Sequence, residues 1–136
     1  MRSASAVALA LLALAACGGG ANPVRDELLH GIEQIRTTHD DHRLHRELSR
    51  TLRKLGRGPA GSARDRRAKR LALRGFALMR DGTESRIAFV ENDSGNLYAA
   101  QRDAGRAYHA FLRGGELLRA AARLYGKSVT LPGPTR

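Results

Sequence analysis

The sequence predicts an all-α protein, an elongated antiparallel bundle of three helices after a cleaved signal peptide, or of four helices if residues 92–96 form a turn. Apolar residues recur three and four positions apart along most of the chain after residue 23, which is the period of a helix. No stretch alternates apolar and polar residues with a period of two, as a half-buried strand does. The chain has no tryptophan, and its aromatic residues all lie at or after Phe76. Leucine and alanine must therefore fill most of the core, which implies closely packed helices.

The first helix is predicted over residues 23–55. Asn22 supplies a capping side chain, and Pro23 suits the first helical position. Two apolar stripes follow, namely Leu28, Ile32 and Ile35, and then Leu44, Leu48, Thr51 and Leu55. These stripes do not share a phase, so the helix is expected to rotate its buried face, kink or break near residues 37–41. Gly56 is expected to end it.

The second helix is predicted from Ser62 to about Arg80. Ser62 and Asp65 have the spacing of a capping box at its start, and Gly82 is the predicted stop. A third helix is then expected to start near Thr83 and to continue to about residue 127.

A seven-residue repeat runs along this third predicted helix. Its members are Ile87, Val90, Ser94, Leu97, Gln101, Ala104, Tyr108, Phe111, Gly115, Leu118, Ala122 and Tyr125. Such a repeat favours helices packed at a shallow angle. The segment from Asn92 to Asn96 is typical of a turn, but the repeat keeps its phase across it, so one continuous helix is favoured. Leu97, Tyr108, Phe111 and Leu118 are accordingly expected to be buried, in the domain or in a partner.

Residues 1–16 have the features of a secretory signal peptide. A cation at Arg2 precedes an apolar run over residues 6–16, which is about half the length that a membrane-spanning helix needs. Cys17, the only cysteine, directly follows residues 14–16, Leu-Ala-Ala. The divisions predicted after the signal are a flexible spacer that carries the anchor (17–22), the helical bundle (23–127) and a loose tail (128–136).

The segment from Leu14 to Cys17 resembles the lipobox of bacterial lipoproteins. In that family the cysteine thiol carries a diacylglyceryl group, the chain is cut just before the cysteine, and the new amine is often acylated with a fatty acid such as palmitate. The whole chain also resembles small helical lipoproteins of actinobacteria, through its arginine-rich and alanine-rich helices and the run Glu91 to Asn96 that leads into Leu117 to Ala121. The resemblance implies a protein held by Cys17 at the extracytoplasmic face of the cell membrane. An ordinary secretory signal is the alternative.

Positive charge is concentrated in one part of the chain. The formal net charge is +11, and loss of residues 1–16 removes only Arg2 and leaves +10. Between residues 50 and 74 the only acid is Asp65. The ten cations in the same stretch, here named the basic cluster, are Arg50, Arg53, Lys54, Arg57, Arg64, Arg66, Arg67, Lys69, Arg70 and Arg74. They predict binding to anionic lipid headgroups or a wall polyanion, with a merely solvated end as the plain alternative. Nucleic acid is not expected as a partner after export.

The predicted first helix also places the basic cluster relative to the membrane. If that helix is unbroken and stands upright, its far end lies about 50 Å from the bilayer. Headgroups are then several screening lengths away, since the Debye length is about 8 Å at physiological salt. An upright bundle is favoured, which leaves a wall polymer or a protein as the partner. A bundle that lies flat would place the cluster on anionic lipid instead.

Four residues are weak candidates for metal ligands: His39, Asp41, His42 and His45. They offer imidazole and carboxylate groups within two helical turns, and zinc or a similar metal accepts such groups as ligands. No HExxH pattern is present, however, and the ligands that would complete the shell are not identifiable, so no metal is predicted. No cofactor is predicted either, because the chain has no glycine-rich phosphate loop after a strand.

The sequence therefore predicts a lipid-anchored, non-enzymatic helical module of the bacterial cell envelope. It is expected to bind or space an anionic envelope component through the basic cluster. No catalytic residue is predicted, because the carboxylates near Glu91 have no nucleophile or histidine at a suitable spacing. The alternative is a subunit of an envelope complex that docks on a protein partner through the long third helix.

Overall fold

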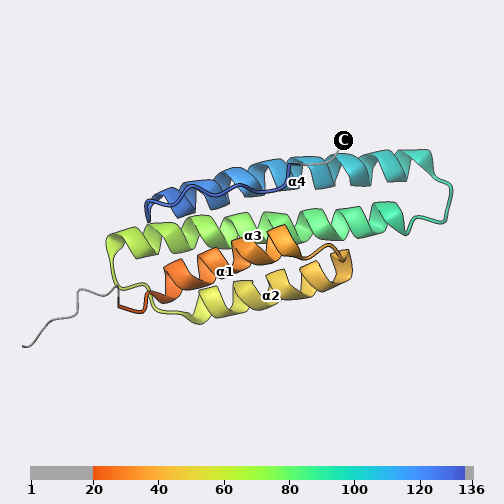
Figure 1. Ribbon diagram of the computed structural model, residues 1–136. Coiled ribbons are helices and arrows are strands. Elements are labelled where there is room, and N and C mark those ends of the chain that lie inside the picture. The colour runs from red at the N-terminus through yellow and green to blue at the C-terminus, as the bar shows by residue number, and fades with distance from the viewer. Residues whose placement is uncertain (1–19, 134–136) are drawn as a thin grey trace, which may run out of the picture.

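The computed structural model describes residues 20–133, which form four α-helices and no strand (Figure 1). These helices are α1 (Pro23–Thr37), α2 (Asp41–Arg57), α3 (Ala63–Val90) and α4 (Leu97–Arg123). Each helix runs in the opposite direction to the one before it, so the described part of the chain is an elongated up-and-down bundle. The predicted all-α class is confirmed, and the bundle has four helices, the stated alternative to three.

A break after Thr37 divides the predicted first helix into the hairpin of α1 and α2. Thr38 and Asp40 both have extended backbone angles. The Asp40 carboxylate accepts a hydrogen bond from the backbone N–H of Arg43 at 2.6 Å and so caps the start of α2. Because α2 begins with a new helical phase, both apolar stripes face the same core. The end of α2 therefore returns to the level at which α1 begins.

Helix α3 begins where the sequence predicts and runs past its predicted end. The Ser62 hydroxyl accepts a hydrogen bond from the backbone N–H of Asp65 at 3.0 Å, which confirms the predicted N-cap. Gly82 is not a stop but a buried residue inside α3. A Cβ at this position would lie 3.1 Å from the Ala110 Cβ and from the Phe111 ring. Gly82 therefore allows α4 to approach α3 closely.

Residues 91–96 form a turn between α3 and α4, so the predicted continuous third helix is wrong. The Asn92 side-chain oxygen accepts hydrogen bonds from the backbone N–H of Ser94 at 3.2 Å and from its hydroxyl at 2.5 Å. Gly95 has a φ of +66°, and the Asn96 side chain caps α4. Turn-forming residues thus override the continuous phase of the apolar repeat.

Burial along the repeat changes with distance from the α3–α4 turn. Leu97 is 82% exposed, so it is not buried within the domain. Tyr108 and Phe111 are half-buried, whereas Leu118 is fully buried as predicted. The reason is that α3 and α4 extend beyond the α1–α2 turn, as Figure 1 shows. Beyond that turn no third helix covers the repeat.

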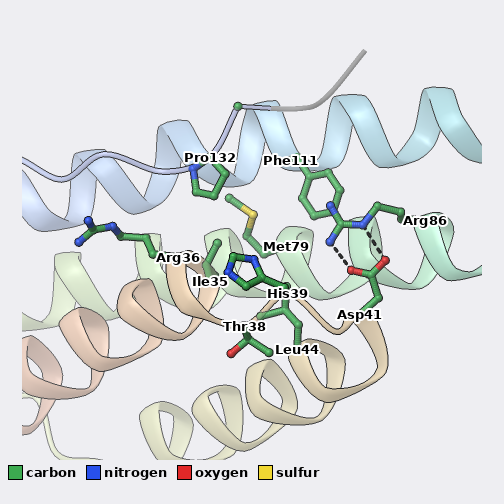
Figure 2. Close-up of a pocket in the computed structure, with 11 residues that line it drawn as sticks. Ile35, Arg36, Thr38, His39, Asp41, Leu44, Met79, Arg86, Phe111 and Pro132 are labelled. Carbon is green, nitrogen blue, oxygen red and sulfur yellow. Dashed lines mark hydrogen bonds and ion pairs between the residues drawn. The ribbon is translucent and has the colours of Figure 1, made fainter.

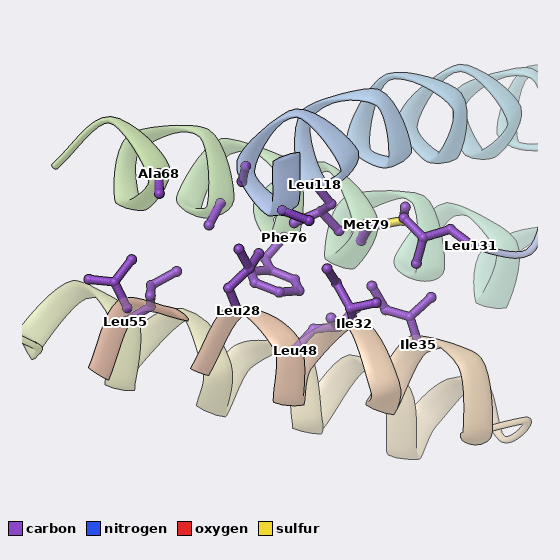
Figure 3. Packing of buried hydrophobic residues seen from close by; sticks show 14 of the residues in the cluster. Leu28, Ile32, Ile35, Leu48, Leu55, Ala68, Phe76, Met79, Leu118 and Leu131 are labelled. Atoms are coloured by element: carbon purple, nitrogen blue, oxygen red, sulfur yellow. The ribbon is translucent and has the colours of Figure 1, made fainter. Parts of the chain in front are cut away.

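The hydrophobic core lies where all four helices overlap (Figure 3). Its larger members are Leu28, Ile32, Ile35, Leu44, Leu48, Leu55, Phe76, Met79 and Leu118. Two glycines set the close packing of α3 on α4. A Cβ on Gly75 would lie 2.8 Å from the Leu118 side chain, and one on Gly114 would lie 3.0 Å from the Gly75 carbonyl oxygen. The chain has few large apolar residues, and the close approach of the α3 and α4 backbones leaves less space for them to fill.

The chain after α4 turns at Gly126, which has a φ of +67°, and runs back along the bundle (Figure 1). Leu131 in this segment is only 7% exposed and joins the core, and Val129 packs against it. The expectation of a loose tail therefore does not hold for these two residues. Residues 1–19 and 134–136, and with them Cys17 and the predicted signal peptide, lie outside the described residues.

Candidate functional site

The basic cluster lies at the end of the bundle where α1 begins, which we name the basic end. The Asn22 amide, just before α1, donates a hydrogen bond to the Asp65 carboxylate of α3 at 3.0 Å. Gly20 and Gly61 line the same cavity of about 400 Å³ between the first described residues and the α2–α3 turn. The cluster is thus beside Gly20 and not at the far end of a 50 Å helix. The chain reverses after Thr37, so the end of α2 lies beside the start of α1, which corrects the predicted position of the cluster.

Asp65 joins three of the four helices at the basic end. Its carboxylate accepts hydrogen bonds from the Tyr125 hydroxyl at 2.6 Å and from the Asn22 amide. The Tyr125 hydroxyl above all, then Asn22 and Ser62, hold the pKa of Asp65 down to about 2. Burial, together with the hydrogen bond to Asp65, raises the pKa of the Tyr125 hydroxyl. The only acid within the basic cluster is therefore ionised and occupied by contacts that hold the bundle together.

Three of the ten cations have contacts within the protein. The Lys69 ammonium donates to the carbonyl oxygens of Gly56 at 3.1 Å and Gly58 at 2.7 Å, so it caps the end of α2. Arg50 pairs with Glu47 at 2.9 Å. The Arg64 guanidinium lies over the Tyr125 ring, 5.3 Å from its centre. Lys69, which the sequence assigns to anion binding, thus has a structural role.

The other seven cations of the cluster form no ion pair with any residue from 20 to 133. They are Arg53, Lys54, Arg57, Arg66, Arg67, Arg70 and Arg74, and all are exposed. Their positive charge is therefore available to an anionic partner. An anionic surface would also relieve the mutual repulsion of these side chains.

The four weak metal candidates are not brought together. Asp41 accepts two hydrogen bonds from the Arg86 guanidinium, one of them 2.8 Å long from Nε to Oδ2. His42 Nε2 lies 2.5 Å from Glu91 Oε1, and this hydrogen bond raises the pKa of His42. Within the described range, no group of three or more His, Cys, Asp or Glu side chains is placed to hold a metal ion. Asp41 and His42 instead join the start of α2 to the last part of α3 and its C-cap, Glu91.

A cavity of about 460 Å³ opens beside the α1–α2 turn (Figure 2). His39 and the paired Asp41 and Arg86 lie at its rim, and the Arg86 guanidinium covers the Phe111 ring at 4.7 Å. Ile35, Leu44 and Met79 of the core form its floor. Asp41 is the only carboxylate among the described lining residues, and it is bound by Arg86. Sequence spacing gave no signal for Arg86, which is 45 residues from Asp41.

No protein-family model, curated protein or solved structure matches this chain. Among the four helices of residues 20–133, none combines the length and the apolar character that crossing a bilayer requires. The basic end, with seven exposed and uncompensated cations, is therefore the main candidate site.

Proposed function

We propose that this protein is a lipid-anchored, non-enzymatic module of a bacterial cell envelope, and that its basic end binds the anionic headgroups of the membrane that holds its anchor. The lipid would be attached to Cys17, as the lipobox resemblance implies. The cell surface or periplasmic face of a membrane is the corresponding location. A wall polymer is the less favoured anionic partner.

The observation that carries the proposal is the position of the basic end beside Gly20. Gly20 is three positions after Cys17, and a fully extended chain covers at most about 3.6 Å per residue. A lipidated Cys17 would therefore lie within about 11 Å of Gly20. That distance is comparable with the screening length of about 8 Å at physiological salt. The cluster is thus close enough to be attracted by anionic lipid.

The cations would add to an anchor that is already stable. A diacylglyceryl group with a further acyl chain holds a protein on a bilayer, whereas one chain binds only marginally. Each cation near an anionic surface adds about 1 kcal/mol. The expected contribution of the basic end is therefore orientation of the bundle and preference for anionic lipid, rather than retention itself.

Vesicle binding tests the electrostatic part of the proposal. The unlipidated full chain, Cys17→Ser, is expected to bind anionic vesicles, to bind neutral vesicles weakly, and to lose its anionic binding as salt rises. Changing Arg66, Arg67 and Arg70 to glutamine should weaken the anionic binding about 100-fold, at about 1 kcal/mol per cation. The matched control changes three exposed arginines of α4, namely Arg102, Arg106 and Arg113, to glutamine. Equal weakening by both sets would contradict a role for the basic end.

Labelling in cells tests the anchor. Incorporation of a fatty-acid analogue should be lost in Cys17→Ser, and the protein should leave the membrane fraction. Unchanged labelling in this variant would contradict lipidation at Cys17, whatever the vesicle results are.

Docking on a protein partner is the second candidate function. Large apolar residues are exposed at the opposite end of the bundle, where α3 ends and α4 starts: Phe89 (45%), Val90 (70%), Leu97 (82%) and Tyr98 (87%). Association through such residues persists at high salt, whereas headgroup binding does not. Salt-resistant recovery of a partner protein that Leu97→Asp abolishes would favour this candidate.

A further inference from the structure

One face of α2 forms a groove lined entirely by cations. Its lining residues are Arg50, Arg53, Lys54 and Arg57, and its volume is about 180 Å³. They follow one another at spacings of three, one and three, which places all four on one side of the last two turns of the helix. Leu48, Thr51 and Leu55 face the core from the other side. The groove therefore lies on the outer surface of the basic end.

The charge within the groove is largely uncompensated. Arg50 has an acidic partner, Glu47, but Arg53, Lys54 and Arg57 form no hydrogen bond or ion pair with another side chain in residues 20–133. Like charges three and four positions apart on a helix repel one another. The carbonyl end of the helix dipole favours cations in the last turn only, so it explains Lys54 and Arg57 but not Arg53. A bound anion would supply the missing compensation.

The side chains of the groove and their spacing favour a phosphate group. Guanidinium groups match the oxygens of phosphate in a two-point geometry, and a lysine ammonium adds a compact charge. The four side chains lie within two helical turns, so they can meet on one compact anion. Four cations in one groove favour a group with two or more negative charges over one with a single charge.

From these features we infer that the α2 groove binds a doubly charged phosphate group, such as a phosphate monoester or a pyrophosphate. The inference deepens the proposed function by naming the group that the basic end selects. Lys54 also lines a neighbouring cavity with Pro23 and Asp26 at the start of α1, so the groove opens near the first described residues. Both a lipid headgroup and a soluble phosphate compound carry this chemistry.

Titration calorimetry of the unlipidated full chain, Cys17→Ser, with inorganic pyrophosphate tests the groove. One bound pyrophosphate per chain is expected. The pair Arg53→Gln and Arg57→Gln should weaken binding at least about tenfold, because each charge-assisted hydrogen bond contributes more than a neutral one. The pair Arg102→Gln and Arg106→Gln on α4 removes the same charge and should change binding less than about twofold. All four positions are exposed, so the variants should unfold at the temperature of the parent chain.

Two results would contradict phosphate binding in the α2 groove. One is the absence of pyrophosphate binding by the parent chain at millimolar concentration. The other is an equal loss when Arg66 and Arg70, which lie outside the groove, are changed to glutamine, since that would show a diffuse charge effect. In either case binding to anionic vesicles can persist, so the proposed function would stand without the groove.

Vesicles then distinguish the source of the phosphate. At equal total negative charge, vesicles with phosphatidate, a monoester, should bind more tightly than vesicles with phosphatidylglycerol, a diester, if the group belongs to a lipid. Changing both Arg53→Gln and Arg57→Gln should abolish the preference for phosphatidate. Pyrophosphate binding without any lipid preference would support the groove and assign it to a soluble phosphate compound.

Discussion

The Asp65 carboxylate of α3 accepts hydrogen bonds from Asn22, just before α1, and from Tyr125, just after α4, so its ionisation affects how these helices are held together. Because the folded-state pKa is lowered to about 2, the stability that Asp65 contributes is fully present above its ordinary pKa near 3.8. This contribution is lost as the pH falls from about 4 toward 2. An Asn at this position can still accept from Tyr125 and Asn22 but cannot be ionised.

The melting temperature of the parent chain should therefore fall between pH 4 and pH 2 partly because of Asp65. In Asp65→Asn the melting temperature should be lower at pH 6 and should depend less on pH over this window. Thermal unfolding followed by circular dichroism at a series of pH values measures both effects. Asp93→Asn, in the exposed α3–α4 turn, is the control. Parallel curves for the parent chain and Asp65→Asn would contradict the assigned role.

Two leucines of the same helix should respond differently to truncation. Leu118 is fully buried against α3, whereas Leu97 is 82% exposed at the start of α4. Leu118→Ala should lower the free energy of unfolding by about 2 to 5 kcal/mol. Leu97→Ala should change it by less than about 0.5 kcal/mol. Denaturant titration of the two variants is the measurement, and a large loss at Leu97 would show that this residue is covered in solution.

At the scale of helices, glycine determines how closely α3 and α4 pack. A Cβ at Gly75 would collide with Leu118, so Gly75→Ala should destabilise by about 1 to 3 kcal/mol despite the better helix propensity of alanine. Gly105 is also inside a helix, but no neighbouring atom lies within 4 Å of a Cβ built there. Gly105→Ala should therefore stabilise by about 0.5 to 1 kcal/mol. Opposite signs in denaturant unfolding are expected, and equal stabilisation would contradict the close approach at Gly75.

The starts of α1 and α3 were predictable because the residues that cap them act locally. Asn22 and Ser62 both accept the hydrogen bonds expected of an N-cap. The end of α3 was not predictable, because Gly82 is as typical of a helix stop as of a helix contact. Only the position of Ala110 and Phe111 on the neighbouring helix decides between the two roles.

The cations of the candidate site could be predicted from the sequence, but their distance from Cys17 could not. The sequence alone identifies the ten cations, whereas the internal contacts of Arg50, Arg64 and Lys69 and the groove on α2 are known only from the structure. The distance of the cations from Cys17 depends on whether residues 37–41 kink or reverse the chain, and the two stripes allowed either. The packing of both α1 and α2 on Phe76 favours reversal, and that contact lies outside any local sequence pattern.

In the molecule as a whole, the two ends of the bundle differ in net charge. The basic cluster holds ten cations against one acid, whereas residues 81–110 hold five carboxylates against three arginines. An anionic surface therefore attracts one end and not the other. On the proposed lipid anchor, such a charge distribution would orient the long axis of the bundle away from the membrane.

Fluorophores at the two ends of the lipidated protein test this orientation. A label at Gly61→Cys, in the α2–α3 turn, should be quenched strongly by lipids that carry a quencher in the headgroup. A label at Asp93→Cys should be quenched little, because α3 alone separates the two turns by about 42 Å. Equal quenching at both positions would show that the bundle lies flat on the membrane.

The reversal after Thr37 also determines how the bundle carries mechanical load. Helices α1 and α3 run in the same direction (Figure 1). The chain enters α1 at one end of the bundle, and the α3–α4 turn lies at the opposite end. A pull between Gly20 and the α3–α4 turn would therefore slide α1 along α3, so that all contacts between them resist together. If the chain had continued straight through residues 37–41, α3 would have run back to end near Gly20, and the same pull would have peeled the helices apart a few contacts at a time.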